Sequence, residues 1–210
     1  MPRLFFALLL ILPLAACGPQ LVETDVTRFH SMAAPTAGQS FSIVPLEHQR
    51  GSIEFQTYAD LVAAEMSRRG YNPVPLERNP DLVVRMAYGV DQGRTEVRSS
   101  PVYGSFGYGL GWGRPRYGLG LGATWPWGPD VVGMDYRSVT KYGKILELEI
   151  LDGSASRRGA PQKLFEGRAV SESRARDLPA VMPYLVQALF DRFPGPSGQT
   201  VRVAIPVPGG

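Results

Sequence analysis

Cysteine and histidine are almost absent from this chain of 210 residues, which contains one cysteine, Cys17, and two histidines, His30 and His48. A disulfide needs two cysteines, so the folded part must be stabilised by core packing. A transition-metal centre needs several converging histidine, cysteine or carboxylate ligands, and the two histidines stand outside any ligand spacing. We therefore predict that the chain holds no metal ion.

The motifs of common catalytic and nucleotide-binding sites are missing as well. No Gly-x-Ser-x-Gly nucleophile elbow occurs, and Gly104-Ser105-Phe106-Gly107 has the wrong spacing for one. The glycine runs alternate strictly, and no Lys-Ser/Thr pair follows them, which excludes a P-loop and a dinucleotide fingerprint. We therefore expect no bound cofactor and no enzymatic activity.

One carboxylate pair invites a catalytic interpretation. Glu147 and Glu149 share one face of a predicted strand, about 7 Å apart, a separation that could suit the two carboxylates of a glycoside hydrolase. The alternation with apolar Leu146 and Leu148 also predicts a solvated charged face, and we favour that interpretation. Asp152-Gly153 then indicates a turn at the end of the strand.

Charge of neither sign dominates, and long apolar runs are missing beyond the N-terminal segment. There are 22 Lys and Arg against 19 Asp and Glu, a formal net charge of +3. This excess is too small to indicate nucleic-acid binding, although a few arginines could help to hold an anionic membrane surface. After residue 17 no apolar run approaches the roughly 20 residues of a membrane helix. We expect the folded part to lie beside a membrane without crossing it.

The N-terminal segment is the most informative part of what the sequence does contain. Met1-Pro2-Arg3 is a short basic start, and Leu4 to Leu14 is an apolar run within the roughly 7–15 residues of a signal h-region. Leu14-Ala15-Ala16-Cys17 follows. The segment resembles a bacterial lipoprotein signal with its lipobox, which implies that residues 1–16 are removed and that Cys17 is lipidated. The alternative is an ordinary secretory signal with an incidental cysteine near its end.

Lipidation of Cys17 would attach the chain permanently to a membrane. A diacylglycerol and an N-acyl chain exceed the two-chain threshold for stable anchoring, because each buried methylene adds about 0.8 kcal/mol. In enterobacterial lipoproteins an aspartate after the lipidated cysteine favours retention at the inner membrane. By that resemblance, Gly18 implies sorting to the outer membrane.

Changes of hydrophobic period predict one α+β domain over residues 24–206, between a lipidated tether at 17–23 and a tail at 207–210. We expect strands at 26–30, 41–46, 81–91, 135–151, 163–172 and 200–205, and amphipathic helices at 53–69 and 178–193. The segment 135–151 is either one long strand or a hairpin bent near Gly143. Packing both helices on one sheet face is the simplest two-layer solution. We therefore predict a mostly antiparallel sheet of about six strands, in the order β-β-α-β-β-β-α-β.

A segment rich in glycine and aromatic residues interrupts this pattern at 99–133. All three tryptophans lie in it, and no acidic residue occurs from Val97 to Pro129. Because glycine is costly to order, the segment is either a flexible low-complexity insertion or a mobile hairpin that docks on a partner, on itself or on lipid headgroups. Aromatic side chains flanked by arginines suit an apolar–water boundary. The candidate binding surface comprises Tyr108, Trp112, Arg114, Arg116, Tyr117, Trp125 and Trp127.

Two short motifs carry a family resemblance. Arg69-Gly70-Tyr71 closes the first predicted helix, and Asn79-Pro80-Asp81-Leu82-Val83-Val84 opens the next long strand. With the lipobox and a second helix closing on Phe193-Pro194, the chain resembles the uncharacterised bacterial lipoproteins grouped as domain of unknown function 4136, although Pro80 replaces the usual small residue. The resemblance brings no activity with it. Local structure explains the motifs, because Gly70 suits a left-handed helix cap and Tyr71 can pack beneath the helix end.

These observations favour a lipid-anchored protein of the bacterial envelope, attached to the outer membrane with its domain in the periplasm. We expect a non-enzymatic binding or envelope-assembly module whose partner is another envelope protein or a polymer. The alternative is a periplasmic hydrolase acting on cell-wall or lipid material. A deep pocket with converging Asp, Glu and His side chains would favour the hydrolase, and an open sheet with an aromatic loop would favour the module.

Overall fold

Eight strands and three α-helices form an α+β fold in the computed structural model, which describes residues 20–32, 38–104 and 130–208. Seven strands have the order β3-β2-β4-β6-β7-β1-β8, and β5 pairs with β6. The strands are β1 Leu21–His30, β2 Ser40–Ile43, β3 Asn72–Pro73, β4 Leu82–Val90, β5 Arg94–Gly104, β6 Asp130–Asp152, β7 Lys163–Ser173 and β8 Gln199–Pro206. The helices are α1 Ile53–Arg68, α2 Gly153–Arg157 and α3 Leu178–Phe190, with short 3₁₀ turns η1 Glu47–Gln49 and η2 Leu76–Arg78.

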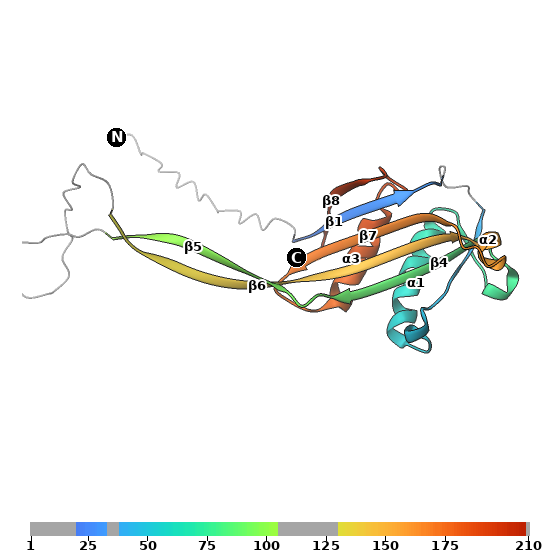
Figure 1. The fold of residues 1–210 in the computed structure, drawn as a ribbon, viewed down its shortest axis with the longest axis horizontal. Helices are drawn as coiled ribbons and strands as arrows, with labels where there is room; N and C mark the ends of the chain where they lie inside the picture. The colour runs from blue at the N-terminus through green and yellow to red at the C-terminus, as the bar shows by residue number, and fades with distance from the viewer. Residues whose placement is uncertain (1–19, 33–37, 105–129, 209–210) are drawn as a thin grey trace, which may run out of the picture.

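The two long helices lie together on one face of the sheet (Figure 1). Each begins at a side chain that caps its first free amides: Ser52 Oγ accepts from Phe55 N at 3.1 Å, and Asp177 Oδ1 accepts from Ala180 N at 3.2 Å. Their apolar stripes meet the inward side chains of the central strands. The fully buried centre of this core includes Val62, Met66, Met182, Leu185, Leu189, Leu146, Leu148 and Ile150. The two-layer packing predicted from the amphipathic helices is therefore present.

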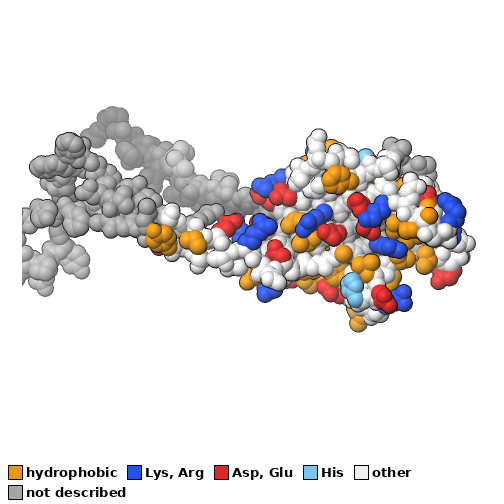
Figure 2. Space-filling view, viewed as in Figure 1, with side chains coloured by type: hydrophobic (Ala, Val, Ile, Leu, Met, Phe, Trp, Pro, Cys, Tyr) orange, Lys and Arg blue, Asp and Glu red, His pale blue; other side chains and the backbone are white. Residues whose placement is uncertain are grey.

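The other face of the sheet is charged, and among the described residues no helix of comparable length covers it. Glu147 and Glu149 point to this face and form ion pairs with the neighbouring strand, at 3.5 Å to Arg168 and 2.8 Å to Lys163. In the view of Figure 2, basic and acidic side chains intermingle over the body of the molecule. The glutamate pair thus lies on the charged face that the alternation predicts, each carboxylate beside a basic group.

Strand β6 is a single strand of 23 residues that serves two parts of the molecule. Its second half, from Lys144 on, lies in the body between β4 and β7, whereas its first half has β5 as its one partner among the described strands. The paired β5 and first half of β6 project from the body as a two-stranded arm, which we call the arm (Figure 1). Of the two predicted alternatives for 135–151, the long strand is correct and the hairpin at Gly143 is not.

The predicted α+β class is confirmed, but the sheet has more strands than predicted and its pairing is mixed, with parallel as well as antiparallel pairs. The described residues contain eight strands rather than about six, and β2 pairs in parallel with both β3 and β4. The parallel pairing arises because α1 carries the chain back from the end of β2 to the start of β4, as in a strand–helix–strand crossover. Three elements, β3, β5 and α2, are absent from the predicted order.

Several predicted boundaries also change. Strand β1 begins at Leu21, so the predicted tether at 17–23 overlaps the sheet. Both ends of the predicted insertion at 99–133 belong to strands of the arm, since β5 runs to Gly104 and β6 starts at Asp130. Helix α3 ends at Phe190 rather than at residue 193, because Asp191 leaves the helical conformation and Arg192 has a φ of 49°.

Candidate functional site

The residues predicted from sequence to carry function lie outside the described part of the chain. This applies to the lipidation residue, Cys17, and to the candidate binding surface. The members of that surface are Tyr108, Trp112, Arg114, Arg116, Tyr117, Trp125 and Trp127. The structure does describe the arm, which flanks the predicted surface in the sequence: β5 ends at Gly104 before it, and β6 begins at Asp130 after it.

The side chains described on the arm leave apolar groups in solvent. Val97 of β5 is 64% exposed and Tyr136 of β6 is 69% exposed. The contacts that hold the two strands together are modest: Thr95 and Thr140 hydroxyls lie 3.1 Å apart, and Lys141 Nζ lies 3.0 Å from Glu96 Oε2. Among the described strands, β5 pairs with no strand other than β6. The arm therefore presents two strand edges and exposed apolar side chains.

One carboxylate fixes the root of the arm. Asp91 Oδ1 accepts hydrogen bonds from Gly143 N at 2.8 Å and from Gly93 N at 2.9 Å. The Gly143 amide, together with that of Gly93, holds the pKa of the Asp91 carboxyl below its ordinary value. Gly93 has a φ of 84°, a conformation that glycine adopts without strain. The chain can therefore leave β4, turn at this point and resume pairing with β6 as β5.

A buried lysine lies beside the same root. Lys144, on β6, is 0% exposed, and its ammonium donates to Ser173 Oγ and, at 3.1 Å, to Ala175 O. Burial lowers the pKa of the Lys144 ammonium. The lysine thus joins the end of β7 and the loop before α3 to the strand that carries the arm.

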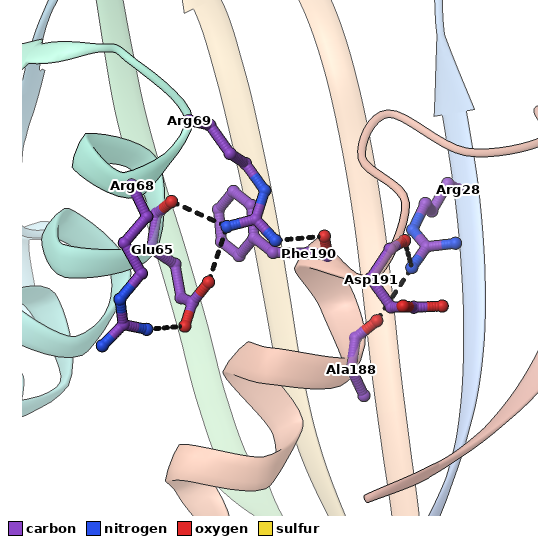
Figure 3. A network of polar contacts seen from close by, with 7 residues as sticks. All are labelled: Arg28, Glu65, Arg68, Arg69, Ala188, Phe190 and Asp191. Carbon is purple, nitrogen blue, oxygen red and sulfur yellow. Dashed lines mark hydrogen bonds and ion pairs between the residues drawn. The ribbon is translucent and has the colours of Figure 1, made fainter.

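A second polar cluster lies where α1 and α3 end (Figure 3). Glu65 forms ion pairs with Arg68 and, at 2.6 Å, with Arg69, whose guanidinium also donates to Phe190 O. On the other side of α3, Arg28 is 2% exposed and donates to the carbonyls of Ala188, Leu189 and Asp191, at 2.8, 3.1 and 3.0 Å. These contacts satisfy carbonyls that a helix C-terminus leaves free, so the cluster stabilises the fold.

The family motifs have the local roles that were expected of them. Gly70 ends α1 with a φ of 87°, and Tyr71 is buried beneath that end. Asp81 immediately precedes β4, and its carboxylate accepts from the backbone N and the Oγ of Ser40, at 2.8 and 2.7 Å. The Ser40 hydroxyl and amide lower the pKa of the Asp81 carboxyl. Asp81 therefore ties β2 to β4.

Within residues 20–32, 38–104 and 130–208, the side chains form no metal-binding cluster and no helix is suited to span a membrane. His30 Nε2 lies 2.9 Å from Gly195 O, and no group of three or more His, Cys, Asp or Glu side chains in the described residues is placed to hold a metal ion. Among the described helices, none has both the length and the apolar composition needed to cross a membrane.

Sequence reasoning missed a surface hollow at the end of the body farthest from the arm. It has a volume of about 580 Å³ and lies between η1, η2, β4 and α2. Three arginines line it, Arg50, Arg85 and Arg157. They come from three separate elements, so no local motif could have joined them.

Comparison with known proteins identifies the family of this chain. A PDZ domain protein from Parabacteroides distasonis is 13% identical with a TM-score of 0.44, and the match covers 88% of this chain but 39% of that one, less than half of its length. The PelC dodecamer from Paraburkholderia phytofirmans is 10% identical with a TM-score of 0.42, covering 79% of this chain and 94% of that one. An uncharacterized protein of Zymomonas mobilis is 29% identical over 229 residues, 91% of this chain and 83% of that protein. The sequence model of the family described as "Domain of unknown function (DUF4136)" matches residues 25–195, and this chain belongs to that family, as its motifs predicted.

Proposed function

We propose that this protein is a lipid-anchored component of the bacterial envelope whose α+β domain acts as a non-enzymatic binding or assembly module. In this proposal Cys17 carries the anchor, the domain lies in the periplasm, and the arm contacts another envelope protein. The proposal for the anchor rests on the sequence before and around Cys17. The proposal for the module rests on the arm.

The observation that carries the binding role is that, among the described strands, the two strands of the arm pair with no third strand along its length. A two-stranded ribbon is marginally stable at best in water, and the described side chains of the arm include the exposed Val97 and Tyr136. Unpaired strand edges accept a further strand, so contact with a partner protein would supply the backbone and apolar contacts that the ribbon lacks. In the sequence, the seven residues of the predicted binding surface lie between the two strands of the arm.

The anchor is tested by Cys17→Ser in the full chain expressed in its host. We expect the native protein to fractionate with the outer membrane and to release a Cys17 peptide whose mass includes a diacylglycerol and an acyl chain. The serine variant is expected in the soluble periplasmic fraction, because no two-chain anchor remains. An unmodified Cys17 thiol in the native protein, or unchanged fractionation of the variant, would contradict the anchor.

The partner surface is tested by site-specific photocrosslinking in cells. A photoreactive phenylalanine analogue replaces Val97 or Tyr136 in the arm, or Ile53 as the control, which is 85% exposed on α1. We expect both arm positions to give the same adduct, identified by mass spectrometry as one envelope protein, and Ile53 to give none. No adduct from the arm, or the same adduct from Ile53, would refute the role of the arm.

A further inference from the structure

We propose that the hollow lined by Arg50, Arg85 and Arg157, which we call the arginine hollow, binds a small oxyanion, carboxylate or phosphate, that is carried on a compact apolar group. This site lies at the opposite end of the body from the arm and does not depend on the proposed function. Its volume of about 580 Å³ falls within the roughly 300–1,000 Å³ typical of small-molecule sites.

The lining of the arginine hollow carries more positive than negative charge. Among the described residues, Arg50, Arg85 and Arg157 form no ion pair, and one acidic residue, Glu47, lines the same space. Arg157 donates from Nη1 to Pro80 O at 3.0 Å, which fixes its direction and leaves its other donors free. Guanidinium groups recognise carboxylate and phosphate with paired hydrogen bonds.

The remaining lining of the arginine hollow is largely apolar. Its apolar side chains come from the segment before η1 (Val44 and Leu46), from η2 (Leu76) and from β4 (Val83). A bare inorganic anion would leave these side chains without a contact. An anionic group attached to an apolar body would contact both the arginines and the apolar lining, which is why we assign that class of ligand.

Both walls of the arginine hollow are fixed to the sheet. Gln49, 5% exposed, donates from Nε2 to Met86 O at 3.2 Å and accepts from Leu46 N at 3.0 Å, which holds η1 against β4. On the other side, Gly153 N donates to Asp81 O at 2.7 Å, and a Cβ on Gly153 would lie 2.0 Å from Pro80 O. Walls held in this way preserve the space for a ligand, since little ordering remains to oppose binding.

The neighbouring hollow on the open sheet face offers the contrast. Its volume is about 400 Å³, and its lining includes Arg168 together with Glu147, Glu149 and Glu166. There Arg168 lies 3.5 Å from Glu147, and both Glu149 and Glu166 pair with Lys163. Because those charges already compensate one another, that hollow offers no comparable attraction for an anion.

The test is calorimetric titration of the purified full chain, held in non-ionic detergent, with phenyl phosphate, benzoate and benzylamine. We expect saturable binding of at least one of the two anions and none of benzylamine. Arg50→Gln and Arg85→Gln are each expected to weaken that binding by about tenfold or more, because each removes charge-assisted hydrogen bonds. Arg168→Gln is the matched control and is expected to leave the affinity unchanged.

The relative affinities of the two anions show which anionic group the ligand carries. Tighter binding of phenyl phosphate assigns a phosphate-bearing ligand, and tighter binding of benzoate assigns a carboxylate-bearing one; both outcomes support the site. The site is refuted if neither anion binds, if benzylamine binds equally well, or if Arg168→Gln weakens binding as much as Arg85→Gln. Thermal melts accompany each variant, and because Arg50 and Arg85 are exposed, we expect their melting temperatures to match the native protein.

Discussion

The buried guanidinium of Arg28 should be among the most important single side chains for stability. It donates three hydrogen bonds to the carbonyls of Ala188, Leu189 and Asp191. Arg28→Ala removes all three hydrogen bonds, including the one to the buried carbonyl of Leu189, whereas Ala188 O keeps its bond from Asp191 N. Hydrogen bonds from a charged donor contribute about 1.5–3 kcal/mol each, but such contributions are not additive within one cluster. We therefore expect the free energy of unfolding to fall by about 3–5 kcal/mol.

Urea denaturation of the full chain measures this loss. With a slope of about 2 kcal/mol per molar urea, the midpoint should fall by roughly 1.5–2.5 M while the slope stays constant. Arg28→Met keeps most of the side-chain stem but should be destabilised nearly as much as Arg28→Ala, because it also lacks the three guanidinium hydrogen bonds. Arg202→Ala is the control: its pair with Asp25 is exposed to solvent and should contribute little to stability. If Arg28→Ala costs no more than Arg202→Ala, the clamp on α3 does not stabilise the fold.

Three further predictions concern the C-terminal end of β6 and the root of the arm. Gly153→Ala should lower the free energy of unfolding by about 1–3 kcal/mol in urea melts, because its Cβ meets Pro80 O, whereas Gly89→Ala has open space and should cost less than about 1 kcal/mol. Asp91→Asn should speed amide hydrogen exchange at Gly93 and Gly143 while Asp135→Asn does not. Since the pKa of Asp91 is lowered, its stabilising effect is present above the unfolded-state value and is lost as pH falls through the folded value, so acid should mimic Asp91→Asn. Lys144 should make stability depend on pH because burial lowers the pKa of its ammonium. The free energy of unfolding of the native protein, relative to that of Lys144→Met, should therefore rise as pH increases from about 7 toward the ordinary lysine pKa of about 10.4. A difference that is flat or falls with pH in paired urea melts would contradict this.

The long periodic segments could be predicted from sequence because their burial is one-sided. Alternation in 81–91 and 163–172 and helical spacing in 53–69 reflect directly which side chains face the core, and the corresponding elements β4, β7 and α1 are present. The helix end at Gly70 was equally readable, since a positive φ after a helix selects glycine.

The missed elements depend on contacts that are distant in sequence. Strand β5 has no regular alternation, because it forms an arm with no core to bury a face, and its pairing with β6 crosses the whole insertion. Asp152-Gly153 indicated a turn, and the same pair can also open a helix: Asp152 Oδ1 accepts from Ala155 N at 2.7 Å and caps α2. The parallel pairing of β2 could have been predicted, because a helix connects it to the next strand and such crossovers join parallel strands. The prediction of a mostly antiparallel sheet did not apply this rule.

Strand β6 also determines how the two proposed surfaces relate. The root of the arm is at Gly143 and the wall of the arginine hollow is at Gly153, and ten residues of extended strand span about 33 Å. Over that distance β6 is paired on both sides, with β4 and β7, so it forms a stiff central strand of the body. Sites so far apart with no shared side chain usually behave independently. An anion in the arginine hollow should therefore leave the adducts from Val97 unchanged, and loss of those adducts on addition of phenyl phosphate would mean that the body itself changes conformation.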